Sequence, residues 1–375
     1  SRDDDNGSFT ISGTQLIINS SPDFETKASY NIYINVNDGA NNYAKAFTVS
    51  VTNIDESPTG LTFKTSTLPN IDFLIVAGGG GGAGGGGGGG GVLQRTNISL
   101  SSITSDSTLS VTVGSGGAYG WARLKNGTSG GNSSIENQIA IGGGGGGTNS
   151  FGTNVSNSGL NGGSGGGGAW DKPYIAYSIG TAGQGNRGGK TDRGEYGASG
   201  GGGGAGAVGG NARGKHMGGN GGNGIQSSIT GTTTYYGGGG GGGVNNNNNS
   251  NVSSHAGSGG LGGGGTGSSL GIIHWPNNSS NATSGDPNTG GGGGGTDPES
   301  NVAGNGGSGI VIIRYQGSPR ATGGTINQNG GYTIHSFTQV GSSTLTFQRE
   351  FPGSFNEGSP VGTVVGNLTA TDSDT

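Results

Sequence analysis

The chain has 375 residues, of which 97 are glycine, and only 27% are hydrophobic. The glycines follow no strict three-residue period, which excludes a collagen triple helix. The formal net charge of −5 excludes the basic surface expected of a nucleic-acid-binding protein. Cysteine is absent, which excludes thiol catalysis, disulfides and zinc–thiolate sites. No apolar run approaches the roughly 18 residues that cross a bilayer, so we expect no membrane span.

Residues 1–58 have the pattern of β-strands. The runs 8–11, 15–18, 30–36 and 46–51 alternate apolar and polar residues or are β-branched, and Asn-Gly, Ser-Gly and Asp-Gly turns separate them. A proline and a glycine end the segment. We therefore expect these residues to form part of a β-sandwich.

Residues 59–315 form a glycine-rich domain between two strand-like runs. The run Phe73–Val76 leads into the domain and the run Gly309–Tyr315 leads out of it. We expect these two strands to lie near each other in one sheet and to hold the domain together. Between them the glycine tracts recur, and they include Gly84–Gly91, Gly142–Gly147, Gly200–Gly204, Gly237–Gly243 and Gly290–Gly295.

Two conformations are open to these tracts. A flexible linker is the ordinary state of a glycine run. The alternative is a bundle of polyproline-II-like rods, in which eight residues span about 25 Å and make no internal hydrogen bonds. Neighbouring rods without Cβ atoms can approach closely and bond to one another, which offsets the conformational entropy that glycine loses. The recurrence of tracts of similar length favours the bundle, which is called polyglycine II.

The remaining residues are also strand-like. Runs 332–337 and 344–347 predict a β-hairpin unit, residues 316–350, that packs on the glycine-rich domain. Residues 351–375 begin another strand pair. No stretch longer than one turn has an apolar period of 3.6 residues. The sequence therefore predicts an all-β protein with essentially no α-helix.

Both ends of the chain resemble the bacterial cadherin-like repeat. Asp23–Lys27, followed by a strand and Asn37-Asp38-Gly39, is similar to an internal segment of that repeat, and Val49–Pro58 resembles its closing motif. Phe355–Val365 resembles its opening motif, and Thr371–Asp374 resembles its D-x-D loop. The resemblance implies that residues 1–58 are the C-terminal part of one cadherin-like sandwich and that residues 351–375 are the N-terminal part of the next.

The same resemblance implies a calcium site. Calcium takes six to eight oxygen ligands, which carboxylates and carbonyls from several loops supply. The alternative is that these residues are solvated turn acids. The nominated ligands are Asp23, Glu25, Asn53, Asp55, Glu357, Asp372 and Asp374.

The central region resembles the glycine-rich domains of bacterial and phage surface proteins. Phe73–Gly80 is similar to the start of such domains, Ser308–Tyr315 to their end, and residues 321–338 to an accompanying hairpin unit. The tract pattern is more distantly similar to phage tail-tip adhesins and to the glycine-rich domain of the anaplastic lymphoma kinase receptor group. That similarity implies packed polyglycine helices whose connecting loops contact a partner.

Aromatic residues inside the glycine-rich domain are candidate ligand contacts, because aromatic rings on exposed loops are enriched among strong contacts to partners. The alternative is that they lie over the bundle and cover its glycine faces. The candidates are Trp121, Trp170, Tyr174, Tyr235, Tyr236 and Trp275.

Nothing in the sequence indicates an enzyme. The many G-x-G-x-x-G matches open no helix after a strand, so they do not predict dinucleotide binding. The four histidines have no metal-ligand spacing, and His335 lies in a predicted strand, where we expect a structural role. No nucleophile–base–acid arrangement stands out.

We therefore expect a structural module of a large extracellular or cell-surface protein. Its copies would assemble head to tail through the complementary cadherin-like halves, as a homopolymer or a tandem repeat. The alternative is an adhesin that presents loops from a polyglycine bundle to a surface glycan or protein receptor. A secreted hydrolase or an ice-binding protein is a third, less favoured class.

Overall fold

The structure, a computed structural model, divides into two compact units, whose described residues lie in 4–52 and in 69–347. No described residue is in an α-helix, and the 3-10 turn η1 (Asn6–Ser8) precedes the first strand. The predicted all-β class is thereby confirmed. The structure describes residues 4–12, 15–24, 26–37, 42–52, 69–100, 108–121, 124–148, 158–170, 178–191, 197–214, 216–244, 255–269, 281–296 and 302–347.

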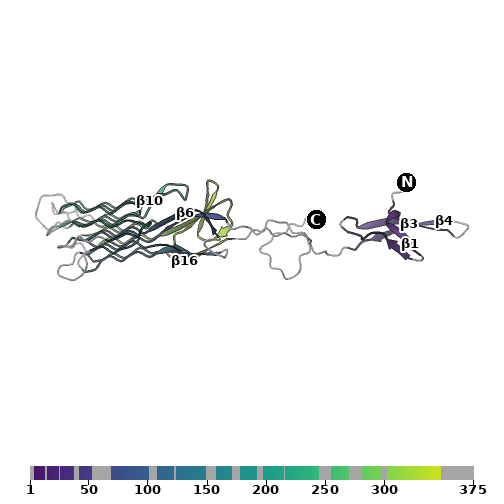
Figure 1. Cartoon of the computed structure of the whole chain (residues 1–375), viewed down its shortest axis with the longest axis horizontal. Helices are drawn as coiled ribbons and strands as arrows, with labels where there is room; N and C mark the ends of the chain where they lie inside the picture. The colour runs from purple at the N-terminus through teal and green to yellow at the C-terminus, as the bar shows by residue number, and fades with distance from the viewer. Residues whose placement is uncertain are drawn as a thin grey trace. The chain divides into compact units, whose positions relative to one another are not determined.

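The described part of the first unit consists of two antiparallel hairpins (Figure 1). Tyr30 and Ile32 are its buried apolar side chains among the described residues. The side chain of Asp5 accepts a hydrogen bond from the N–H of Asn31 at 2.8 Å. The pKa of Asp5 lies below its usual value, because Lys27 and then this backbone N–H bond to the carboxylate. The strands are β1 (Phe9–Ser12), β2 (Gln15–Ile18), β3 (Ser29–Asn37) and β4 (Asn42–Ser50).

The second unit is built on two five-stranded antiparallel sheets. One sheet has the order β14–β15–β12–β5–β6 and the other has the order β13–β16–β7–β8–β9. A separate hairpin consists of β10 and β11. The bounds are β5 (Asn70–Val76), β6 (Val92–Ser99), β7 (Thr108–Val113), β8 (Ser133–Ile135), β9 (Gln138–Ala140), β10 (Ile225–Ser227), β11 (Thr234–Tyr236), β12 (Ile310–Gln316), β13 (Ala321–Thr322), β14 (Thr325–Asn329), β15 (Tyr332–Phe337) and β16 (Gly341–Phe347).

The strands that flank the glycine-rich domain are direct neighbours. Strand β5 pairs with β12, and Val76 lies opposite Ile310. The expectation that these strands share one sheet is thus confirmed. Strand β15 also pairs with β12, and β16 pairs with β7, so the residues after Gln316 supply strands to both sheets.

Two apolar clusters of the second unit lie on the β5–β12 sheet, one on each face. Alternate residues of β12, Val311, Ile313 and Tyr315, pack toward the second sheet. Ile310 and Ile312 point to the opposite face, where Tyr236 belongs to the same apolar cluster. Because β12 is covered on both faces, its sequence is a continuous apolar run rather than an alternating one.

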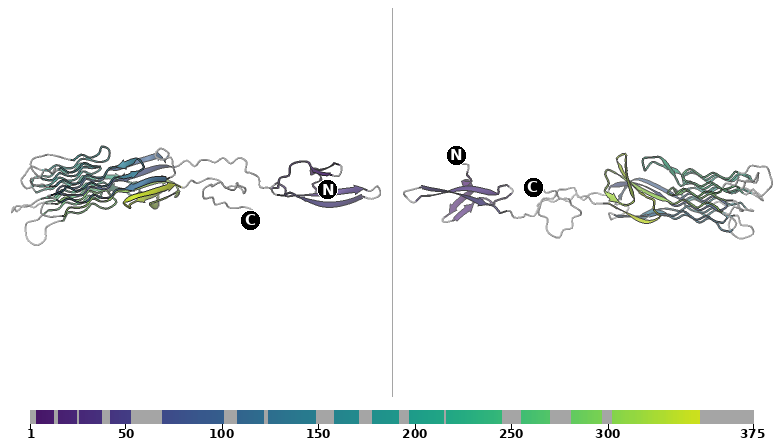
Figure 2. Two further views of the ribbon diagram at one scale, coloured as in Figure 1. Left: turned by 90° about the horizontal axis from the view of Figure 1, so that it is seen from below. Right: turned by 180° about the vertical axis from the view of Figure 1, so that it is seen from behind.

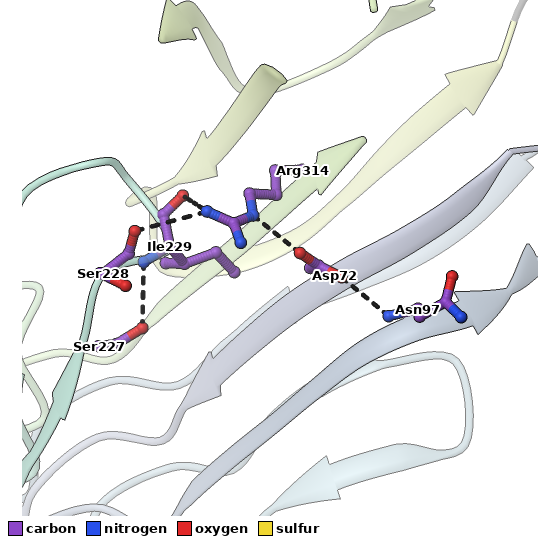
Figure 3. Close-up of polar contacts among 6 residues, drawn as sticks. All are labelled: Asp72, Asn97, Ser227, Ser228, Ile229 and Arg314. Atoms are coloured by element: carbon purple, nitrogen blue, oxygen red, sulfur yellow. Dashed lines mark hydrogen bonds and ion pairs between the residues drawn. The ribbon is translucent and has the colours of Figure 1, made fainter. Parts of the chain in front are cut away.

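A polar network ties the β10–β11 segment to this second face (Figure 3). The Nε of Arg314 donates to Asp72 at 2.9 Å, and its Nη1 donates to the carbonyl of Ile229 at 3.2 Å. The other carboxylate oxygen of Asp72 accepts the N–H of Asn97 at 2.8 Å, where the β5–β6 register shifts. The guanidinium of Arg314 also lies over the ring of Tyr332. One arginine therefore joins β5, β12, β15 and the segment that covers them.

A second network fixes His335, which is fully buried in β15. Its Nδ1 lies 2.7 Å from the carbonyl of Gly323, so that nitrogen donates and Nε2 accepts from the hydroxyl of Tyr315 at 3.1 Å. Tyr315 in turn accepts the N–H of Arg320 at 3.0 Å. Burial lowers the pKa of His335, and the bond to Gly323 offsets part of that shift. The expected structural role of this histidine agrees with its position.

The glycine tracts run side by side away from the sheets (Figures 1 and 2). Residues 77–83, which continue β5, show how they bond. Their N–H groups donate in turn to three different tracts: Ala77 and Gly80 to residues 91 and 88, Gly78 and Gly81 to residues 131 and 128, and Gly79 and Gly82 to residues 307 and 304. Each partner tract is thus reached by every third residue.

The carbonyls of the same tract accept bonds from three further tracts, which contain Gly117, Gly143 and Gly293. Residues 77–83 therefore have six neighbouring tracts, and the tract at 84–91 is surrounded in the same way. A Cβ atom built on Gly87 would lie 2.1 Å from the carbonyl oxygen of Gly80. We call this array of hydrogen-bonded tracts the lattice. At interior positions such as Gly87 a side chain would collide with neighbouring backbone, so glycine is required there.

The two ends of the lattice are different. At the end next to the sheets, tracts continue directly from strands such as β5 and β7, and the turns use left-handed residues such as Gly262, Gly263 and Gly290. Strand β5, the first of this unit, begins at Asn70, and β16, the last, ends at Phe347, both on the side of the sheets away from the tracts. The opposite end is therefore farthest from both chain connections of this unit.

Candidate functional site at the loop end of the glycine body

We call residues 77–309 of the second unit the glycine body, and we call its end away from the sheets the loop end. Hydrogen bonds bring the described tract ends together there. The N–H of Thr296 donates to Ala83, and the N–H of Val244 donates to Ser268. The hydroxyls of Ser268 and Thr296 lie 3.0 Å apart. Segments far apart in the sequence therefore meet at this end of the glycine body.

Hydrogen bonds also fix the turn at Trp121 at this end. The carbonyl of Trp121 accepts bonds from the N–H groups of Leu124 and Lys125 and from the hydroxyl of Thr148, at 2.9 to 3.0 Å. Asn126 accepts the N–H of Thr148 at 2.9 Å, which ties the turn to the neighbouring tract. The side chains of Trp121 and Leu124 are 53% and 72% exposed. The backbone holds this apolar pair in place while its side chains face solvent.

The other predicted aromatic contacts are placed differently. Trp170 lies at the loop end but is only 3% exposed. Tyr235 and Tyr236 lie in β11, beside the sheets, and Tyr236 is 6% exposed. Burial raises the pKa of Tyr236, and a hydrogen bond with Thr234 opposes the shift. For Trp170 and Tyr236 the burial favours a packing role over ligand contact. The remaining two candidates, Tyr174 and Trp275, lie outside the described residues.

A family model described as a glycine-rich domain matches residues 58–316. The chain belongs to this family. Comparison with curated proteins gave no match, and comparison with solved structures gave none. The match covers both flanking strands and the whole glycine body, so the domain includes part of each sheet.

Of the nominated calcium ligands, Asp23 is the one that the structure describes. Outside the glycine-rich domain, Asp23 accepts bonds at one carboxylate oxygen from the N–H of Thr26 and at the other from its hydroxyl. This geometry is that of a local turn. Among the described residues no group of three or more acidic, histidine or cysteine side chains could hold a metal ion. The other nominated ligands, Glu25, Asn53, Asp55, Glu357, Asp372 and Asp374, lie outside the described part of the chain.

Two features of the glycine-rich domain were not predicted. Leu124 is the partner of Trp121 in the exposed pair, and its signal is an apolar residue within a short polar insert between tracts. The Arg314–Asp72 pair joins residues 242 positions apart, and no local pattern links them. In the described part of the chain, no helix has the length and apolar character that a membrane crossing needs.

Proposed function

We propose that the second unit is a stiff, non-catalytic module of an extracellular or cell-surface protein, and that its loop end contacts a surface glycan or protein receptor. One observation carries the proposal: both chain connections leave the unit at the sheet end, so the loop end faces away from them. A body whose chain connections lie at one end is suited to presenting its opposite end.

The hydrogen-bond pattern supports the stiffness. Each interior tract bonds to neighbours in several directions with a period of three residues. This is the pattern expected of polyglycine II, because a polyproline-II helix has three residues per turn. Motion of one tract breaks bonds to several others, so the lattice keeps its loop end in a fixed arrangement. A pre-organised binding surface loses less entropy when a partner binds.

Binding of the intact protein to a glycan array and to cell surfaces tests this proposal. We expect saturable binding that falls at least tenfold in the W121A/L124A double variant. The control is Ile326→Ala, which removes an exposed apolar side chain from β14 at the sheet end. Absence of saturable binding, or equal loss in both variants, would refute the presenting role.

A second proposal concerns assembly through the first unit. Ile11 and Leu16 face each other across β1 and β2 and are 61% and 41% exposed, and Phe47 of β4 is 43% exposed. We propose that cadherin-like strands of another copy, as in residues 351–375, cover these side chains head to tail, with calcium at the junction. Concentration-dependent sedimentation that the Leu16→Asp variant abolishes would support this assembly. A monomer at all concentrations, with and without calcium, would refute it.

A further inference from the structure

Backbone N–H groups at the perimeter of the glycine lattice lack the neighbouring tracts that satisfy those of the interior. Inside, each N–H meets a carbonyl of an adjoining tract, as for residues 84–91. A tract on the perimeter has neighbours on one side only, so some of its N–H groups point past the last tract. Such N–H groups recur every third residue, about 9.3 Å apart. They resemble the open edge of a β-sheet, which can pair with another chain.

Asparagine side chains accept these N–H groups in the tract that contains Ser258 and Leu261. Oδ1 of Asn220 accepts the N–H of Ser258 at 3.0 Å, and Oδ1 of Asn223 accepts the N–H of Leu261 at 3.0 Å. Both asparagines are exposed. The two acceptors and the two donors are each three residues apart, which matches the period of the lattice. The N–H groups between them, such as that of Gly260, bond to interior carbonyls instead.

The same contact recurs around the glycine body. Asn132 accepts the N–H of Gly142, and Asn126 accepts the N–H of Thr148, each at 2.9 Å. Here the spacing is six residues on both tracts, which is two periods. Further contacts of this kind join Asn161 with Ile179, Asn211 with Lys190 and Asn305 with Tyr119, at 2.7 to 2.9 Å.

We propose that these asparagines are edge caps that close the lattice, and that the partner they exclude is a glycine tract of a second copy. The amide side chain suits this position because its oxygen replaces the carbonyl of a missing neighbour tract. A glycine there would leave the N–H open to another rod with the same three-residue period. The inference concerns the perimeter of the lattice, where Asn220 and Asn223 lie away from the turn at Trp121, and it does not depend on what the loop end binds.

The test is the N220A/N223A double variant of the full chain in a Leu16→Asp background, which removes the head-to-tail assembly proposed for the first unit. The Leu16→Asp chain with both asparagines is the reference, and all are studied by amide hydrogen exchange and sedimentation velocity. We expect the amides of Ser258 and Leu261 to exchange at least tenfold faster than in the reference chain. The amides of Gly257 and Gly260, bonded to Gly242 and Gly239, should keep their protection and so report that the lattice stays folded. We also expect the variant to sediment as a dimer or larger species.

Two further variants make the result specific. In N220D/N223D the carboxylate oxygen still accepts, so protection and the monomeric state should persist, even if the alanine variant fails to fold. The control variant N281A/N327A removes two exposed asparagines whose side chains accept no backbone N–H in the described structure. Amide exchange at Ser258 and Leu261 and the sedimentation of this variant should stay unchanged. Unchanged amide exchange at Ser258 and Leu261 in N220A/N223A would refute the claim that Asn220 and Asn223 cap these N–H groups. If the amides of Ser258 and Leu261 lost protection but the protein did not associate, the asparagines would not be what keeps a second copy from adding to the lattice.

Discussion

A single methyl group inside the lattice should destabilise the second unit strongly. The change is Gly87→Ala, in the interior tract 84–91. The φ angle of Gly87 is outside the left-handed region, so alanine can adopt its backbone conformation. At a compatible position this substitution ordinarily stabilises a protein by about 0.4–1 kcal/mol, because it restricts the unfolded chain. For Gly87→Ala, whether the protein gains or loses stability therefore depends on how the new methyl group packs.

The structure gives the size of the collision. The new Cβ would lie 2.1 Å from the oxygen of Gly80, whereas ordinary contact begins at 3.4 Å, so the two tracts must separate by about 1.3 Å. The bond from Gly80 to Gly88 is 2.8 Å long and would stretch to about 4 Å, beyond hydrogen-bond range. Overpacking costs about 1–3 kcal/mol, and two or three lost bonds cost about 1 kcal/mol each. We expect a net loss of about 3–5 kcal/mol.

The assay is urea unfolding followed by tryptophan fluorescence, with Gly330→Ala as the matched control. Gly330 lies in the turn between β14 and β15 with φ +57° and nothing within 4 Å of a built Cβ. Alanine there costs only its left-handed backbone conformation, about 1–2 kcal/mol. If Gly87→Ala lost no more stability than Gly330→Ala, the tight lattice inferred from these distances would be refuted.

Four further outcomes follow from the structure. Replacing Arg314 with methionine should cost about 2 kcal/mol of stability, less than breaking a fully buried pair would. A double-mutant cycle with Asp72→Asn should give a coupling of about 1 kcal/mol, and additive effects would contradict the Arg314–Asp72 ion pair. The pKa of His335 in the folded protein lies below the unfolded value of 6.5, so its contribution to stability is full above pH 6.5 and falls as the pH drops toward the folded pKa. In urea titrations over this range the wild type should lose up to about 1.4 kcal/mol per pH unit more than His335→Asn. Parallel pH profiles of the two proteins would contradict this expectation. Tyr236→Ala should cost about 3 kcal/mol and Trp121→Ala less than about 0.5 kcal/mol in the same assay, and equal costs would contradict their different burial. Millimolar calcium should raise the melting temperature of the first unit in a thermal scan, and an unchanged value would remove the calcium proposal.

Local chemistry determined the elements that the sequence could predict. Short β-branched runs form strands in many contexts, so Phe73–Val76 and Gly309–Tyr315 were identifiable as the strands at the two borders of the glycine-rich domain. If long glycine tracts are ordered, their buried N–H and C=O groups need hydrogen-bond partners, and neighbouring tracts can supply them. The sequence also excluded cysteine chemistry, because the residue is absent.

Only the tertiary structure decided which groups meet. One glycine tract is chemically the same as another, so the sequence of a tract does not identify its neighbours. The neighbours are set by the strands that anchor each tract and by the lengths of the connections between tracts. For the same reason sequence could not separate the exposed Trp121 from the buried Tyr236, because both are aromatic residues beside glycine tracts. The bonds of Asn220 and Asn223 to another tract depend on the register between tracts, which has no local signal. Local residue chemistry determines the rods and strands, whereas long-range packing determines the surface that they present.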